Sequence, residues 1–251
     1  MQEAAVSGAA PHGWIVPDWP APTRVRALVT TRMGGVSRGP YASLNLGAHV
    51  GDEPAAVEHN RAVLRSHLPA DPVWLRQVHG REVVDAASAG AFPRADGAIA
   101  RTRHNVCAVL TADCVPVPLA HLGGAAVGVA HAGWRGLADG VVEAALERLR
   151  VPAGEVIAWL GPGIGAGAYE VGRDVYDAFV AGDPGSASAF VAHGDGKFRA
   201  DLAAIPRRRL ARAGVAAVHG GGFCTYTDRA RFYSYRRERT TGRFASLIWI
   251  E

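Results

Sequence analysis

Two histidines and one cysteine, His79, Cys114 and His131, have the side-chain types of a metal centre. Two imidazoles and a thiolate form a borderline-soft ligand set that suits zinc. Three protein ligands leave one tetrahedral position open for water, which is typical of a catalytic zinc site. The intervals between the three residues match no zinc-finger spacing. The prediction therefore depends on residue types and surroundings.

Each of the three residues follows an apolar segment or lies between two such segments. The segments are 73–78 before His79, 106–110 and 115–119 around Cys114, and 125–130 before His131. Strand ends are rigid platforms on which chemistry is often built. A buried structural thiol, or a histidine satisfied inside the core, is the simpler interpretation of any one residue alone. Their shared setting favours one functional site.

Asp113 is the acidic neighbour of Cys114 and lies beside an apolar segment. Burying a carboxylate there without a purpose is costly, which argues against Cys114 being a purely structural thiol. Cys107 lies inside the apolar segment and is interpreted as core. The chain has three cysteines, an odd number without the spacing of a disulfide framework, which indicates reduced thiols.

Copper is an alternative ion, because two histidines and a cysteine also make blue-copper sites with a weak axial methionine. Met33 is the only internal methionine. Multi-copper oxidases use paired His-x-His ligands, and none of the ten histidines lies two residues from another. The ligand count therefore argues against a multi-copper enzyme, while a single copper ion remains possible.

The elements that must position these residues mix strands and helices without a strict βαβ rhythm. This order predicts a single-domain layered sandwich of the α/β (α+β-like) class with a mixed sheet. Strands are expected at 25–30, 73–78, 106–110, 115–119, 125–130, 156–160, 215–218 and 244–250, and helices at 53–68, 137–150, 173–180 and 202–213. Residues 1–22 are expected to be loosely ordered, and 23–251 to form the domain.

The glycine-rich loop 161–166 contains Gly-x-Gly-x-x-Ala, which is similar to a dinucleotide-binding fingerprint. Pro162 lies within this loop and no adjacent parallel βαβ unit is evident, so a tight turn or a cavity wall is the preferred interpretation. Segment 43–47 is interpreted as a turn or a substrate contact. Segment 233–237 is interpreted as a strand edge or an anion clamp.

The formal net charge is +4, and Lys197 is the only lysine among the basic residues. The arginines are spread along the chain without the interleaved aromatics of an RNA module, so no nucleic-acid partner is expected. No run of about 18 apolar residues and no signal-peptide pattern is present, so a cytoplasmic protein without a membrane partner is expected. An anionic small-molecule substrate remains possible.

Several motifs occur together and in order, and through them the chain resembles the YfiH/YlmD family, formerly called laccase-domain or polyphenol oxidase proteins. The motifs are Gly34-Gly35-Val36-Ser37, Ser43-Leu44-Asn45-Leu46-Gly47, Gln77-Val78-His79-Gly80, Thr111-Ala112-Asp113-Cys114, Ala130-His131-Ala132-Gly133-Trp134-Arg135-Gly136, Gly161-Pro162-x-Ile164-Gly165 and Ser234-Tyr235-Arg236-Arg237. The resemblance extends from about residue 24 to the C-terminus. His-Ala-Gly-Trp-Arg-Gly and Thr-Ala-Asp-Cys are its most specific parts.

The resemblance implies a fold similar to the catalytic domain of cytotoxic necrotizing factor toxins. It implies zinc-dependent phosphorolysis of purine nucleosides (adenosine, inosine, guanosine and methylthioadenosine) with adenosine deamination, and a role for His79, Cys114 and His131 as zinc ligands and catalytic residues. The family is also described as peptidoglycan editing factors and as copper-dependent polyphenol oxidases. A metal-free hydrolase with Cys114 as nucleophile and His131 as base, and a non-enzymatic cell-wall factor, remain alternatives.

With that activity in view, four further residues have expected substrate roles and Asp113 is the expected proton shuttle. Arg61, Arg135 and Arg236 are expected to clamp phosphate, because guanidinium binds phosphate bidentately. Asn45 is expected to hydrogen-bond the ribose or the base. For each arginine, a structural ion pair is the simpler interpretation. The expected partners are therefore purine nucleosides and phosphate, and the oligomeric state is left open.

Overall fold

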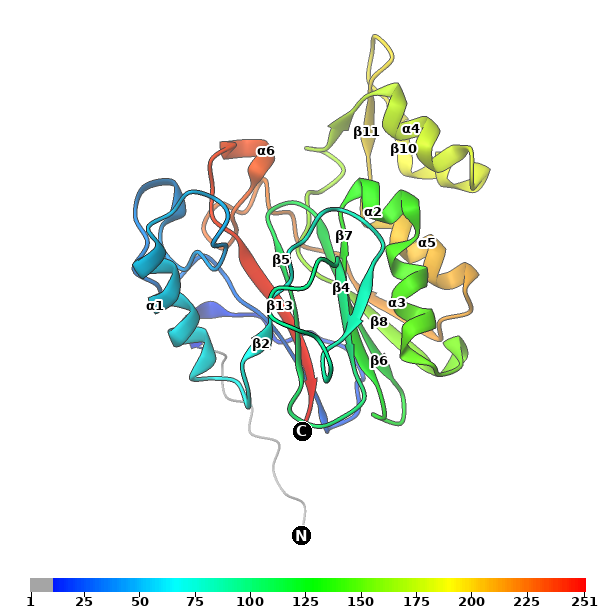
Figure 1. The fold of residues 1–251 in the computed structure, drawn as a ribbon. Helices are drawn as coiled ribbons and strands as arrows, with labels where there is room; N and C mark the ends of the chain where they lie inside the picture. The colour runs from blue at the N-terminus through cyan, green and yellow to red at the C-terminus, as the bar shows by residue number, and fades with distance from the viewer. Residues whose placement is uncertain (1–10) are drawn as a thin grey trace.

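The computed structural model describes residues 11–251 and consists of two mixed β-sheets that face each other (Figure 1). The first sheet has the order β1 (Val25–Val29), β13 (Phe244–Ile250), β5 (Val106–Thr111) and β2 (Pro72–Val73). The second sheet has the order β12 (Ala217–Gly220), β8 (Val156–Leu160), β6 (Val115–His121), β7 (Val127–Ala132), β4 (Gly97–Ala100) and β3 (Val83–Asp85). Parallel and antiparallel pairs occur in both sheets, which confirms the expected mixed α+β architecture.

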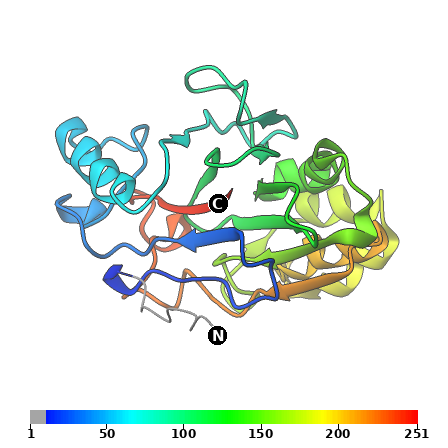
Figure 2. The ribbon, with the colours of Figure 1, turned by 90° about the horizontal axis from the view of Figure 1, so that it is seen from below.

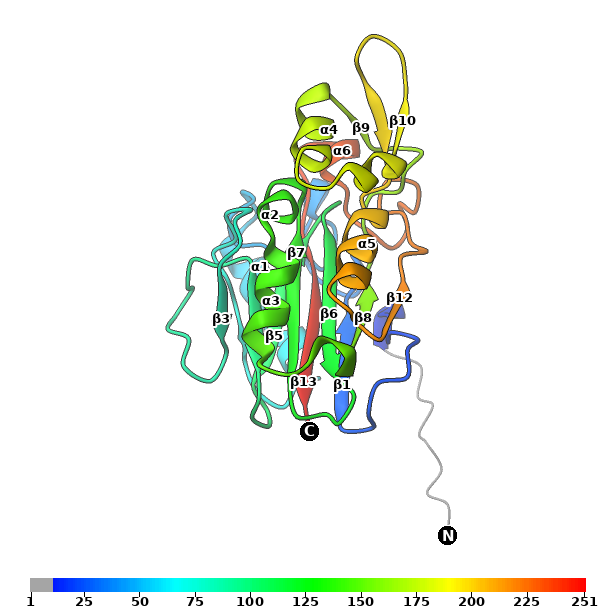
Figure 3. The same ribbon diagram turned by 90° about the vertical axis from the view of Figure 1, so that its right-hand side faces the viewer.

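Helices cover the outer faces of the sheets, and Figure 2 shows them on opposite sides of the strands. Helix α1 (Pro54–Arg65) covers the first sheet, while α2 (Trp134–Asp139), α3 (Val141–Leu149) and α5 (Ala204–Arg212) cover the second, as Figure 3 shows from the side. A small sheet of β10 (Phe190–Ala192), β11 (Phe198–Ala200) and β9 (Glu170–Val171) projects with α4 (Arg173–Val180) at one end. Helix α6 (Tyr235–Glu238) and four short 3-10 helices complete the elements: η1 (Pro11–Gly13), η2 (Gly39–Tyr41), η3 (Ala153–Glu155) and η4 (Pro184–Ala189).

The core between the sheets is built from small and β-branched side chains. Ile248 of β13 and Val109 of β5 pack with Val127 and Val129 of β7 in one buried cluster. Strands β5, β6, β7 and β13 are buried almost throughout their length, because both faces of each sheet are covered. Such strands are expected to be continuously apolar, and these four are nearly so.

Most predicted limits lie within three residues of the observed ones; the strand expected at 125–130 is β7 (Val127–Ala132), so His131 lies inside this strand and not after it. Two elements differ in other ways. The strand expected at 73–78 ends at Val73. The side-chain amide of Gln77 accepts a hydrogen bond from the N–H of Leu110 (2.8 Å) and donates one to the carbonyl oxygen of Leu110 (2.9 Å). The helix expected at 137–150 begins earlier, at Trp134, and breaks at Gly140, where φ is 95°. A side-chain amide thus replaces strand pairing in the first case, and a left-handed residue interrupts the helix in the second.

Part of the segment expected to be loosely ordered is packed against the domain. Residues 1–10 lie outside the described part of the chain. Beyond them, Ile15 pairs with Val29 at the edge of the first sheet, and Trp14 is buried in the cluster beneath α1. The apolar side chains of this segment explain the difference, because they bury surface that alanine, glycine and proline would not.

Candidate metal centre and active site

The structure brings His79, Cys114 and His131 together at one end of the two sheets. One potential ligand atom of each residue lies within 4.8 Å of those of the other two. Sγ of Cys114 is 3.9 Å from Nε2 of His79, and the two imidazole centroids are 4.8 Å apart in an edge-to-face arrangement. His131 is buried, Cys114 is half-buried and His79 is exposed, so the cluster is reached from the His79 side.

Three different elements deliver these side chains. His131 is the penultimate residue of β7 and pairs with Pro116 of β6. Cys114 lies in the tight turn between β5 and β6, in which Asp113 has a φ of 94°. His79 lies in the loop beyond β2 and has a φ of 59°. Two of the three segments therefore depend on unusual left-handed residues, whose conformation must be held by other contacts.

Gly133 and Gly136 allow these segments to approach closely. A Cβ atom on Gly133 would lie 2.7 Å from Cδ2 of His79 and 3.0 Å from Sγ of Cys114. A Cβ atom on Gly136 would lie 2.6 Å from the carbonyl oxygen of Gly80. Glycine is thus required at both positions of the His-Ala-Gly-Trp-Arg-Gly motif for steric reasons, because a side chain at either position would displace the candidate ligands.

The imidazoles change the acidity of the Cys114 thiol. Burial raises the pKa of Cys114, but the charge and hydrogen bonds of His131 and His79 outweigh it and lower the pKa to about 6. Burial lowers the pKa of His131, but the Cys114 thiolate and the Asp96 carboxylate raise it to about 9. The protein groups by themselves therefore favour a thiolate beside an imidazolium at neutral pH.

The donor set fits a single metal ion. A tetrahedral ion with bonds of about 2.0 Å to nitrogen and about 2.3 Å to sulfur places its ligand atoms roughly 3.5 Å apart. The observed separations reach 4.8 Å, and the exposed side chain of His79 has room to close this difference. The lowered pKa of Cys114 favours the thiolate, which is the form that binds metals, whereas the raised pKa of His131 means that a bound ion would have to displace the proton from one ring nitrogen. Within residues 11–251, this is the one group of three or more such ligands.

A cavity of about 420 Å³ adjoins the cluster and carries an excess of basic side chains. The basic residues in its lining, apart from the candidate ligands, are His49, Arg135, Arg236, Arg239 and Arg243. In the part of the chain that the structure describes, Asp113 is the only carboxylate that lines it. Several guanidinium groups around one concave site favour an anionic ligand such as phosphate.

Asp113 lies in the cavity wall and links two of its sides. One carboxylate oxygen accepts a hydrogen bond from the hydroxyl of Thr225 (2.6 Å), and the other accepts one from the main-chain N–H of Arg236 (2.6 Å). Its carbonyl oxygen accepts a further bond from the amide of Ile164. Asp113 therefore connects the turn that carries Cys114 to helix α6.

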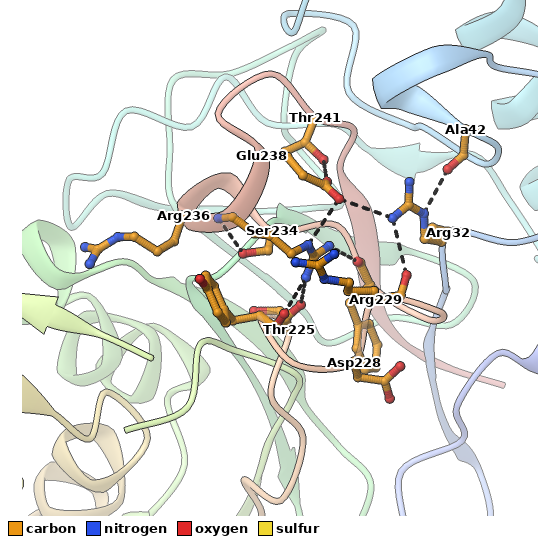
Figure 4. A network of polar contacts seen from close by, with 12 residues as sticks. Arg32, Ala42, Thr225, Asp228, Arg229, Ser234, Arg236, Glu238 and Thr241 are labelled. Carbon is orange, nitrogen blue, oxygen red and sulfur yellow. Dashed lines mark hydrogen bonds and ion pairs between the residues drawn. The ribbon is translucent and has the colours of Figure 1, made fainter. Parts of the chain in front are cut away.

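The two arginines of segment 233–237 have different roles. Arg236 lines the cavity, and Figure 4 shows its side chain directed away from the polar network around Glu238 and Thr225. Arg237 is buried in that network, where its guanidinium donates to Glu238 and to the carbonyl oxygens of Thr225, Tyr226 and Phe232. One guanidinium nitrogen of Arg236 donates to the carbonyl oxygen of Glu170 (2.7 Å), so Arg236 faces the cavity with only part of its donor set free. Arg237 holds the segment in place.

The other three arginines of the lining form no ion pair within residues 11–251, and Arg243 instead donates to the carbonyl oxygens of Thr241 and Gly242. Arg135 and Arg239 form no ion pair with any carboxylate of residues 11–251, and each lies over an aromatic ring, that of Trp134 or Tyr235. Arg135 therefore lines the cavity, where its predicted phosphate contact stays a prediction, and Arg239 is an addition to the expected set.

Asn45 and Arg61, by contrast, do not line the cavity. The buried amide of Asn45 hydrogen-bonds Asp52 and the main chain of Gly47 and Arg243. The guanidinium of Arg61 donates twice to the carbonyl oxygen of Leu46 and stacks over Trp74. These partners are all protein groups, so direct contact with a substrate in the cavity would require them to separate.

Other residues of the site were not predicted from the sequence. They are Asp96, His49, Tyr169, Arg239 and Arg243. Asp96 directly precedes the apolar strand β4, so the cost of burying a carboxylate beside an apolar segment could have identified it. The remaining four lie in segments without a local signal and reach the cavity only through the tertiary fold.

Comparison with known proteins identifies the class. Residues 26–251 match the family described as multi-copper polyphenol oxidoreductase laccase. The chain is 54% identical over 241 residues to a Pseudomonas aeruginosa protein named purine nucleoside phosphorylase, covering 96% of this chain and 99% of that one. It is 50% identical over 239 residues to the purine nucleoside phosphorylase YfiH of Escherichia coli, covering 94% and 98%.

Solved structures agree with these matches. A crystal structure of a Neisseria meningitidis protein superposes with a TM-score of 0.93 at 50% identity, covering 95% of this chain and 99% of that one. YlmD from Geobacillus stearothermophilus gives 0.90 at 32% identity, covering 96% and 97%. The chain therefore belongs to the YfiH/YlmD family, as the sequence motifs predict. None of the helices in residues 11–251 is both long and apolar enough to cross a membrane.

Proposed function

We propose that this protein is a cytoplasmic, zinc-dependent purine nucleoside phosphorylase that also deaminates adenosine. The observation that carries the proposal is the His79, Cys114 and His131 cluster beside a cavity lined by arginines. The names of the Pseudomonas aeruginosa and Escherichia coli relatives support the phosphorylase activity. The substrates proposed are adenosine, inosine, guanosine and methylthioadenosine, with phosphate.

In phosphorolysis, a phosphate oxygen forms a bond to C1′ of the ribose while the bond from C1′ to the purine nitrogen breaks. The bonding electrons leave with the purine, which takes up a proton. Arg135 and Arg236 are the proposed phosphate clamps, supported by Arg239 and Arg243 in the same lining. Asp113, held in the wall by Thr225 and Arg236, is the proposed proton carrier.

Asn45 and Arg61 support this site from behind its wall. The side-chain oxygen of Asn45 accepts a hydrogen bond from the main-chain N–H of Arg243, and the guanidinium of Arg61 donates one to the neighbouring carbonyl oxygen of Leu46. A zinc ion held by the cluster would supply Lewis acidity and an activated water for the deamination of C6. The residues of the chain orient the nucleoside, exclude bulk water and carry protons.

Metal analysis followed by turnover tests the proposal. We expect near-stoichiometric zinc in the purified wild type and its loss in His79→Ala, with phosphate-dependent release of purine base and deamination abolished in His131→Ala. His59→Ala is the matched control, because His59 is exposed on α1 away from the cavity. Full turnover in His131→Ala, or wild type that releases no base from any of the nucleosides, would contradict the proposal.

A metal-free cysteine hydrolase, acting for example as a peptidoglycan editing factor, is the second candidate. The pKa of Cys114, lowered to about 6, and that of His131, raised to about 9, favour it. The expected likeness to cytotoxic necrotizing factor domains points the same way. This activity would survive chelators and be lost on alkylation of Cys114, whereas the zinc enzyme loses activity with chelators and regains it with zinc.

Copper-dependent polyphenol oxidation is the third candidate, supported by the description of the matching family. The single three-ligand cluster within residues 11–251 would serve one copper ion rather than several. Metal analysis decides between the ions, and oxygen uptake with a phenolic substrate by the copper-loaded chain would favour this activity.

A further inference from the structure

Asp96 is a fully buried carboxylate directly behind the metal-ligand cluster. Its Oδ1 accepts hydrogen bonds from Nδ1 of His131 (2.8 Å) and from the main-chain N–H of His79 (2.9 Å). Its Oδ2 accepts bonds from the main-chain N–H groups of Val78 (3.0 Å) and Gly80 (2.8 Å). Four donors on two oxygens leave this carboxylate fully satisfied without water.

The loop that carries His79 is wrapped around this carboxylate. Three successive N–H groups, from Val78 to Gly80, point at Asp96, and His79 itself takes the left-handed conformation that allows this convergence. The predicted strand does not continue here, so these amides have no strand partner. Without an acceptor at position 96, these three part-buried amides would lose their bonds, and the cost of each would be at most about 1–3 kcal/mol, the value for fully buried groups.

The same carboxylate orients the second histidine. An ionised carboxylate can only accept hydrogen bonds, so Nδ1 of His131 must carry the proton in its contact with Asp96. Nε2 is then the ring nitrogen available to a metal beside Cys114. Asp96 also lies opposite His131 in the strand ladder, where the amide of His131 donates to the carbonyl oxygen of Asp96 (2.7 Å).

We propose that Asp96 is the positioning residue of the metal centre: one carboxylate holds the His79 loop and the His131 ring in the geometry that binds the ion. This inference rests on the zinc site of the proposed function. Asp96 touches neither substrate nor metal, and it acts through both histidines. Such outer partners of ligating histidines typically change metal affinity by 10–100-fold when they are replaced.

Zinc affinity of the full-length chain, measured with zinc alone against a competing chelator, tests this role. In Asp96→Asn, one carboxylate oxygen is replaced by an NH₂ group that would face the N–H groups of Val78 and Gly80 or the ring of His131. We expect zinc affinity to fall by about 10–100-fold and the visible spectrum of the cobalt-loaded protein to lose its tetrahedral thiolate signature. The matched control is Asp183→Asn, a second buried carboxylate with several donors, remote from the cluster.

The Asp183→Asn control separates a loss of metal-site geometry from a general loss of stability. Both variants are expected to unfold at lower urea concentrations, but only Asp96→Asn is expected to lose zinc affinity. Wild type that binds zinc tightly, with Asp96→Asn within twofold of it, would overturn this inference and leave the proposed function intact. Wild type that binds no zinc would overturn both.

Nitrogen NMR of the wild-type imidazoles covers the case in which Asp96→Asn does not fold. The proposal requires the proton of His131 on Nδ1 and zinc coordination through Nε2. Coordination through Nδ1, or an unprotonated Nδ1 in the zinc-loaded protein, would overturn the inference without any variant.

Discussion

At the scale of single residues, the site depends on the absence of a Cβ atom at Gly133 as well as on the candidate ligand side chains. Gly133 lies against the side chains of both His79 and Cys114, and its lack of a Cβ atom leaves the space in which these ligand candidates meet. Asp96 on the other side satisfies the amides of the His79 loop. The ligand geometry is therefore determined by contacts with neighbours that bind no substrate.

Gly133→Ala tests the steric part of this arrangement. Gly133 has a φ of −72°, which alanine adopts without strain, so the effect should come only from the Cβ contacts at 2.7 and 3.0 Å. We expect zinc occupancy and turnover to fall by about tenfold or more, with little change in fold. Gly167→Ala is the control, because a Cβ atom there meets nothing within 4 Å. Equal zinc occupancy in both variants would contradict the explanation.

Arg135→Ala tests the anionic part of the cavity. Arg135 lines the cavity without an acidic partner, so its removal should cost phosphate a charge-assisted hydrogen bond of about 1.5–3 kcal/mol. We expect the KM for phosphate to rise by about 10–100-fold, with a weaker dependence on salt. Arg103→Ala, which removes an exposed arginine outside the lining, should leave it unchanged. An unchanged KM in Arg135→Ala would remove this residue from the phosphate site.

At the scale of elements, buried arginines and carboxylates fasten short segments that lack cores of their own. Arg237 fastens α6 to the loop that begins at Thr225. Asp183 does the same for η4, because Arg208 and Arg212 of α5 both contact its carboxylate (2.6 and 2.8 Å). The hydrogen bond from Arg208, aided by Arg212, holds the pKa of Asp183 well below its usual range.

This lowered pKa predicts a pH dependence of stability. A carboxylate whose pKa is lower in the folded state stabilises that state above the unfolded pKa, about 3.9, and this contribution is lost as the pH falls below it. Asp183→Asn should therefore be less stable than wild type at pH 7, and the difference should shrink below about pH 4. Urea unfolding of both proteins between pH 7 and 3 measures it. A difference independent of pH would show that charge is not the cause.

At the scale of the whole molecule, two sheets share one core and present the site at one of its ends. Strand β13, from the C-terminus, lies between β1 and β5 and faces β7 across the core (Figure 1). Cys114 lies in the turn that follows β5 and His131 lies near the end of β7, so packing between the sheets helps to set the distance between these residues.

Ile248→Ala tests this packing. Ile248 is fully buried among residues of both sheets, so truncation should lower the free energy of unfolding by about 2–5 kcal/mol. Val191→Ala, at a side chain 68% exposed, should change it by no more than about 0.5 kcal/mol. Urea unfolding followed by tryptophan fluorescence measures both. Similar values for the two variants would argue against a shared core.

The sequence by itself determined the mixed architecture, most strands and the identity of the candidate ligands. Apolar runs such as 106–110 and 244–250 are local patterns, and a histidine or cysteine after such a run is visible without a fold. The resemblance to the YfiH/YlmD family rests on equally local motifs, and the comparisons confirm it.

Only the tertiary structure decided which residues meet. Asp96 and Arg243 come from separate segments and are held at the site by long-range hydrogen bonds, and His49 lines the cavity from a third segment. The same contacts draw Asn45 and Arg61 into the protein and away from the cavity. Residue type and local periodicity specify what a side chain can do, but its partners depend on chain segments far away in sequence, which no local pattern encodes.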